Sequence, residues 1–124
     1  MTLPRRAALA LPLLAPALAA AQPAWPDRPV RIIVGFPGGS TPDIAARAVA
    51  AHLGTVLGQP VVVDNRAGGG GTIAADAVAK ANDGHTLGVT IGGPGSIARI
   101  LNPNLPYDPL TDLAPISLLA RMPL

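Results

Sequence analysis

Apolar, β-branched runs alternate with alanine-rich segments along most of this 124-residue chain. The run "VRIIVGF" at residues 30–36 is almost continuously apolar, which is typical of a strand buried on both faces of a sheet. The runs "PVVVDN" at 60–65 and "HTLGVTIG" at 85–92 predict two further strands. The last residues, "ISLLARMPL" at 116–124, predict a fourth strand.

The segments between these runs carry apolar residues at helical spacing. The first predicted helix, residues 42–58, places four apolar side chains on one face: Ala45, Val49, Leu53 and Val56. Residues 72–81 and 96–101 predict a second and a third helix. The resulting βαβαβαβ order predicts an α/β fold, in which helices cover both faces of a parallel sheet.

A glycine-rich turn follows each of the first three predicted strands: "GFPGGSTPD", "NRAGGGGT" and "GGPGS". Parallel strands place their carboxyl ends at one edge of the sheet, where ligands bind, so we expect the three turns to gather there. Glycines at a helix N-terminus leave backbone N–H groups open to an anion. The turns therefore predict a cleft for an anionic or polar ligand.

The first turn also has a purely structural interpretation. Ser40 or Thr41 is a good cap for the following helix, and Pro42 suits its first position. The carboxylate of Asp43 falls in the first turn, where it interacts favourably with the helix dipole. These residues explain a stable helix start without any ligand.

The N-terminal residues predict export. Arg5 and Arg6 precede a short apolar stretch that ends in small residues, which is the pattern of a secretory signal peptide at residues 1–21. Pro12 and Pro16 interrupt the stretch, which falls short of the roughly 20 apolar residues needed to span a bilayer. We therefore expect cleavage near Ala21 and no membrane insertion afterwards.

Removal of residues 1–21 changes the charge of the chain. Seven basic residues then remain against seven aspartates, so the mature chain is nearly neutral. A neutral chain with one Trp, one Tyr and one Phe does not indicate a nucleic-acid partner. The sequence has no cysteine, which excludes a disulfide framework.

The sequence lacks the common signatures of an enzyme. It contains no nucleophile elbow, no phosphate-binding P-loop and no dinucleotide-binding glycine motif, and His52 and His85 lack metal-ligand spacing. Glu is absent, and Asp43 is the one carboxylate that we expect to face the cleft. A carboxylate repels a bound anion unless a cation intervenes, so we hypothesise that Asp43 selects a ligand with an amino group.

From Trp25 onward the chain resembles the extracytoplasmic solute receptors of the tripartite tricarboxylate transporter group, the Bug receptors. The matching stretches are "WPDRPVRIIVGFPGGSTPDIAARAVA", "LGQPVVVDNRAGGGGTIAADAVAKANDGHTL" and "NPNLPYDPLTDLAPISLLA". The F-P-G-G turn with its Asp, the N-R-x-G turn and the L-P-Y-D-P connection follow the order seen in that family. The chain departs from the family pattern at Pro42, Asp64, Gly69 and His85, and most strongly in the third turn.

The resemblance implies a type II periplasmic binding-protein-like fold, in which two α/β domains close on a small ligand. Residues 22–124 would then be the N-terminal part of the first domain, with the second domain beyond Leu124. The resemblance further implies a periplasmic receptor without catalytic residues, metal or cofactor. Such a receptor captures a small carboxylate (a tricarboxylate, a dicarboxylate, an acidic amino acid or an aromatic acid) for membrane transporter subunits or a sensor.

The family motifs also imply which residues hold the ligand. Its carboxylate would meet backbone N–H groups and bridging water at the turns, at Gly38, Gly39, Ser40, Thr41, Asp43, Gly68, Gly69, Gly70, Gly71, Thr72, Gly93 and Ser96. The alternative is an α/β enzyme that uses the same turns to bind an anionic substrate, since a fold alone does not determine function.

Overall fold

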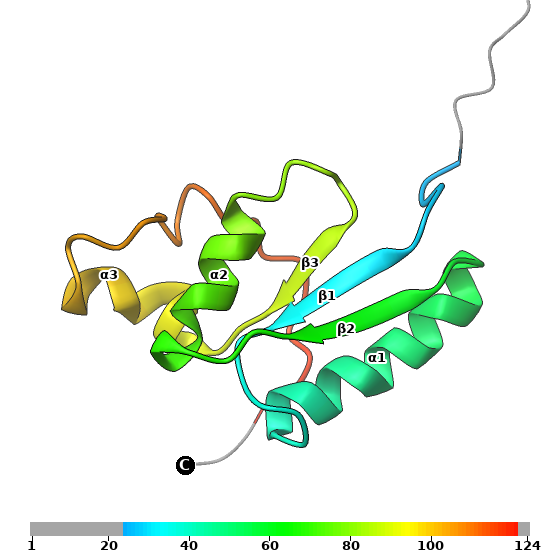
Figure 1. Ribbon diagram of the computed structural model, residues 1–124, viewed down its shortest axis with the longest axis horizontal. Helices are drawn as coiled ribbons and strands as arrows, with labels where there is room; N and C mark the ends of the chain where they lie inside the picture. The colour runs from blue at the N-terminus through cyan, green and yellow to red at the C-terminus, as the bar shows by residue number, and fades with distance from the viewer. Residues whose placement is uncertain (1–23, 122–124) are drawn as a thin grey trace, which may run out of the picture.

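A central strand with a parallel neighbour on each side organises the fold (Figure 1). The computed structural model describes residues 24–121, so the predicted signal peptide lies outside the described residues. The elements run in the order β1 (Val30–Val34), α1 (Thr41–Leu57), β2 (Val61–Asn65), η1 (Gly69–Gly71), α2 (Thr72–Ala79), β3 (Thr86–Val89), η2 (Gly93–Ile97) and α3 (Ala98–Leu101). The strand order is β2-β1-β3, with Ile32 opposite Val63 on one side and Leu87 on the other.

Strand β1 lies in the centre because it is apolar on both faces. Ile32 and Val34 are buried against α1, whereas Ile33 points to the side covered by α2. Figure 1 shows the two helices on opposite sides of the sheet. The predicted parallel α/β sheet with helices on both faces is confirmed.

Helix α1 packs on the sheet through small side chains. Ala46 and Ala50 are buried in the core, which allows close approach of helix and sheet. The helix ends at Leu57, and the following Gly58, which has a left-handed backbone (φ 66°), donates its N–H to the Gly54 carbonyl oxygen at 3.1 Å. The prediction of which face of α1 packs on the sheet was wrong, because Val56 is 66% exposed. The face that contacts the core contains Ala46 and Ala50. Alanine on every side of the helix left the choice of face undefined in the sequence.

Helix α2 covers the other face at even closer range. A Cβ atom on Gly88 of β3 would lie 2.8 Å from a methyl carbon of Val78, so the strand accepts the helix only where it lacks a side chain. A Cβ atom on Gly35, just after β1, would lie 2.7 Å from the Cα atom of Gly71. The first and second turns are therefore in direct backbone contact.

The predicted fourth strand does not form within residues 116–121. Residues 116–121 have no strand conformation, and residues 122–124 lie outside the described part. Ile116 and Leu118 are exposed by 80% and 66%. An apolar pattern becomes a strand only where a neighbouring chain segment supplies hydrogen-bond partners, and no segment within residues 24–121 does so here.

Candidate functional site

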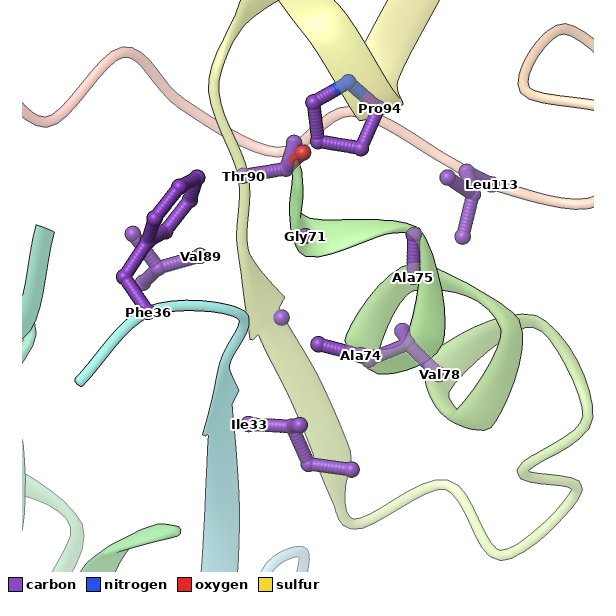
Figure 2. Close-up of a pocket in the computed structure, with 11 residues that line it drawn as sticks. Ile33, Phe36, Gly71, Ala74, Ala75, Val78, Val89, Thr90, Pro94 and Leu113 are labelled. Carbon is purple, nitrogen blue, oxygen red and sulfur yellow. The ribbon is translucent and has the colours of Figure 1, made fainter. Parts of the chain in front are cut away.

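The three glycine-rich turns meet at the carboxyl edge of the sheet, as the sequence predicts. Phe36 comes from the first turn, Gly71 from the second and Pro94 from the third, and Figure 2 shows them around one small cavity. A Cβ atom on Gly71 would lie 3.1 Å from Pro94 Cγ and 3.2 Å from Phe36 Cζ. The buried Tyr107 hydroxyl donates to the Pro94 carbonyl oxygen at 2.8 Å and holds the third turn in place.

In the first turn, the Asp43 side chain is buried rather than open to a cleft. Only 2% of the residue is exposed, and its Oδ2 atom accepts a hydrogen bond from the Gly39 N–H at 2.8 Å. The Arg47 guanidinium donates to both carboxylate oxygens at 3.0 and 3.1 Å. The expectation that this carboxylate faces the cleft was therefore wrong, because the donors that surround it belong to the protein.

These donors also determine the charge state of Asp43. The hydrogen bond from Arg47, followed by those from the Gly39 N–H and the Asn65 amide, lowers the pKa of the Asp43 carboxyl from 3.8 to about 2. Each donor stabilises the ionised form more than the neutral one. Asp43 is accordingly a carboxylate at any pH near neutrality, and its charge is paired with Arg47.

Asn65 and Arg47 hold the Asp43 carboxylate of the first turn, although the sequence analysis did not identify them. The Asn65 amide nitrogen donates to the Phe36 carbonyl oxygen at 3.0 Å and to Asp43 Oδ1 at 2.9 Å. Arg47 also donates to Asn65 Oδ1 at 3.1 Å. Two signals were available: Asn65 ends a strand at the ligand edge, and Asp43 and Arg47 have the i, i+4 spacing of a helical ion pair. Asp43, Arg47 and Asn65, which we call the turn network, tie the first turn to the end of β2.

The second turn uses four consecutive glycines in conformations that other residues avoid. The φ angles of residues 68–71 are 141°, 58°, 64° and 99°. Gly71 N–H donates to the Gly68 carbonyl oxygen at 2.9 Å, and the Thr72 hydroxyl donates to the Gly69 carbonyl oxygen at 2.9 Å. Within residues 24–121, the N–H groups of Gly69 and Gly70 have no protein acceptor. This turn therefore offers free backbone donors just before α2.

The hydroxyls of two predicted site residues are engaged locally. Ser40 Oγ donates to the Pro37 carbonyl oxygen at 2.6 Å, and Ser96 Oγ donates to the Gly92 carbonyl oxygen at 2.6 Å. Ser40 precedes α1 at the cap position, but its side chain makes no cap hydrogen bond. Instead, the Asp43 carboxylate reaches back from the first turn of α1 and accepts a hydrogen bond from the N–H of Gly39, the residue before the cap position.

An open groove of about 420 Å³ lies between the second turn and α3. Four predicted site residues line it, namely Gly69, Gly70, Thr72 and Gly93. The residues of the first turn and Ser96 do not line it. The structure thus joins the second and third turns in one concave surface, with the first turn alongside.

A second, smaller cavity of about 80 Å³ lies between the sheet and α2 (Figure 2). Its walls are formed mainly by core side chains such as Ile33, Ala74 and Val78. This volume is too small for a drug-sized ligand, and we interpret it as a packing gap beneath the turns.

In the described part of the chain, no cluster of three or more His, Asp, Glu or Cys residues could hold a metal ion. No helix among residues 24–121 is long and apolar enough to cross a membrane.

Comparison with known proteins identifies the family of this chain. The model of the tripartite tricarboxylate transporter family receptor matches residues 45–124. The chain belongs to this receptor family. Protein BugT of Bordetella pertussis is 47% identical over 102 residues, which cover 81% of this chain and 31% of BugT. Both the family resemblance and the fold class predicted from the sequence are confirmed.

Several solved structures share this architecture. MatC from Rhodopseudomonas palustris with bound malate gives a TM-score of 0.72 at 43% identity, over 77% of this chain and 33% of MatC. Another R. palustris protein, solved with adipate, gives 0.66 at 42% identity over 70% of this chain and 29% of its own. The periplasmic binding protein BugD gives 0.67 at 39% identity, over 71% and 29%. This receptor chain therefore spans about a third of the length of its relatives.

Proposed function

We propose that this chain forms the first-domain part of a periplasmic receptor that captures a small carboxylate for a tripartite tricarboxylate transporter. The observation that carries the proposal is the pair of free N–H groups at Gly69 and Gly70, at the edge where three turns converge. Backbone donors at a helix N-terminus are suited to a carboxylate. Relatives with the same fold were solved with malate and adipate, both of which carry carboxylates.

In this proposal the predicted site residues have different tasks. The second turn supplies donors through its backbone, and its glycines permit the required conformation. In the first turn, the free N–H of Gly38 would supply a further donor, whereas Asp43 positions the turn from inside. Water bridges would complete the coordination at small cost in free energy. Gly93 lines the groove from the third turn, and Ser96 lies outside it.

The proposal includes export and delivery. Cleavage of residues 1–21 would release residues 22–124 into the periplasm, with the second domain supplied by residues beyond Leu124. The loaded receptor would then pass its ligand to transporter subunits in the membrane. Mass spectrometry of the exported protein would test the processing step, and a mature N-terminus far from Gln22 would contradict it.

Ligand binding is tested by thermal unfolding of the full-length protein with malate, adipate, citrate, glutamate and benzoate. A receptor is stabilised by RT ln(1 + [L]/Kd), which is about 2.7 kcal/mol at a ligand concentration of 100 Kd. The ligand should also be recovered chemically unchanged. No stabilisation by any carboxylate would overturn the proposal, and recovery of an altered compound would favour the enzyme.

The chain provides a matched pair of variants for locating the site. Gly70 and Gly58 have nearly the same left-handed backbone, with φ 64° and 66°, and a Cβ atom on either meets nothing within 4 Å. Gly70→Ala and Gly58→Ala should therefore cost similar stability, about 1 kcal/mol. Only Gly70→Ala should weaken carboxylate binding, by roughly tenfold or about 1.4 kcal/mol, because the alanine favours a φ that turns the free N–H groups away. Equal binding by the two variants would place the site elsewhere.

A further inference from the structure

The groove beside the second turn combines free backbone N–H donors on one wall with apolar side chains on the other. One wall contains Gly69, Gly70 and Thr72, and the other is formed by η2, α3 and the residues just after them. The second wall contributes four apolar side chains: Pro94, Ala98, Leu101 and Leu105. The two residues that carry the free N–H groups and the four apolar side chains therefore line the same concave space.

Among residues 24–121, no charged side chain lines this groove. Its polar side chains are Thr72 and Asn102, and the Thr72 hydroxyl proton is already donated to the Gly69 carbonyl oxygen. The ion pair of the first turn, Asp43 with Arg47, is not part of the lining, and neither is the pair that Arg99 of α3 forms with Asp108. Within the part of the groove that residues 24–121 form, an additional carboxylate would lie against leucine, alanine and proline, where a charge without a partner is strongly disfavoured.

From this arrangement we infer that the receptor prefers a carboxylate with an apolar body, an aromatic or medium-chain aliphatic acid, over a hydroxylated polyacid. The inference rests on the proposed function and names its ligand class. The carboxylate meets the N–H groups of Gly69 and Gly70, and the apolar body lies along Pro94, Ala98 and Leu101. The groove volume of about 420 Å³ is within the range of small-molecule sites.

Leu101 is the residue that best tests the apolar wall. Its side chain lines the groove, yet the residue is 80% exposed in the described part of the chain. The adjacent Ile100 is also 80% exposed and does not line the groove. Leu101→Asn and Ile100→Asn thus make the same change of polarity at neighbouring positions of one short helix, and only one of them alters the groove.

The experiment measures, by calorimetry on the full-length protein, the affinity for benzoate, hexanoate, malate and citrate. We expect benzoate and hexanoate to bind at least tenfold more tightly than citrate. Leu101→Asn should weaken hexanoate binding by roughly tenfold, since even a single methylene contact in an apolar pocket changes affinity by about 10-fold or more. Ile100→Asn should leave that affinity within about twofold of the unchanged protein.

The outcomes separate this inference from the proposed function. Tighter binding of malate or citrate than of both apolar acids would overturn the inference and leave the receptor proposal intact. Equal effects of the two variants on hexanoate binding would also overturn it. So would a loss of thermal stability in Leu101→Asn without a change in hexanoate affinity, because this result would show that another part of the protein covers Leu101. Binding of no carboxylate at all would refute the proposed function itself.

Discussion

Gly35 should be among the least replaceable residues of the domain, because two turns touch there. A Cβ atom at this position would lie 2.7 Å from Gly71 Cα, 3.0 Å from the Gly71 carbonyl oxygen and 3.2 Å from Ala74 Cβ. Non-bonded carbon atoms prefer separations of about 3.5–4.0 Å. Two of the three opposing atoms belong to the backbone, so no rotation of a side chain relieves the overlap. Gly35→Ala must push the second turn and the start of α2 away from β1.

The expected cost follows from two opposing terms. Overpacking of a well-packed region costs about 1–3 kcal/mol, and contact with the backbone places this site at the upper end, about 3 kcal/mol. Gly35 does not have a positive φ, so alanine also restricts the unfolded chain and recovers up to about 1 kcal/mol. The net destabilisation is then about 2 kcal/mol. With an m-value of about 2 kcal/mol/M, the urea midpoint falls by about 1 M.

Gly54→Ala is the matched control for this measurement. Gly54 lies inside α1, and a Cβ atom there would lie 3.6 Å from its nearest neighbour, the Gln59 carbonyl oxygen, which is an ordinary contact. Alanine is favoured over glycine within a helix by about 0.5–1 kcal/mol, so this variant should be more stable than the unchanged protein. Urea unfolding followed by circular dichroism compares the two variants. A midpoint of Gly35→Ala at or above that of the unchanged protein would refute the contact between β1 and the second turn.

The turn network supports two further predictions. Asn65→Ala removes the hydrogen bonds to the Phe36 carbonyl oxygen and to Asp43. At about 1–1.5 kcal/mol for each bond, the free energy of unfolding measured in urea should fall by about 2–3 kcal/mol. Unchanged stability would contradict the network. The second prediction concerns pH: the folded-state pKa of Asp43, lowered from 3.8 to about 2, makes its contribution fully present above pH 3.8 and lost as the pH falls through about 2. Between pH 5 and pH 2, the urea midpoint should therefore fall more steeply for the unchanged protein than for Asp43→Asn, and equal pH dependence in the two would show that the carboxylate is not engaged.

The hydrophobic pattern was sufficient to predict the three strands that pair with one another in the sheet. The β1 run and its two neighbours formed strands as predicted, because each is flanked by a turn and a helix that return it to the same sheet. Residues 116–121 have a similar pattern and no strand conformation. A strand depends on a partner that can lie anywhere in the sequence, and periodicity contains no information about that partner.

The turns were identified from glycine content, whereas their internal contacts were not. The positive φ of residues 68–71 explains why four glycines occur in a row. The spacing of Asp43 and Arg47 indicates a helical ion pair, whereas the hydrogen bonds of Asn65 to Arg47 and to the Phe36 carbonyl oxygen span 18 and 29 residues, which neither composition nor spacing encodes. The exposure of Asp43 was misjudged for the same reason: a carboxylate in the first turn of a helix is typically solvated, and the buried environment follows from three donors that converge in space.

The burial of Asp43 also explains how a carboxylate is tolerated beside the edge at which we propose that the ligand carboxylate binds. A bare carboxylate would repel a ligand carboxylate, and the sequence analysis therefore required an intervening cation, which it assigned to an amino group of the ligand. Arg47 is a cation supplied by the protein, because its guanidinium lies 3.0 Å from the Asp43 carboxylate. The pair leaves little net charge at the first turn, so a ligand meets mainly the dipoles of the backbone N–H groups. An amino group on the ligand is then not required for charge compensation, which is consistent with a site selective for simple carboxylates.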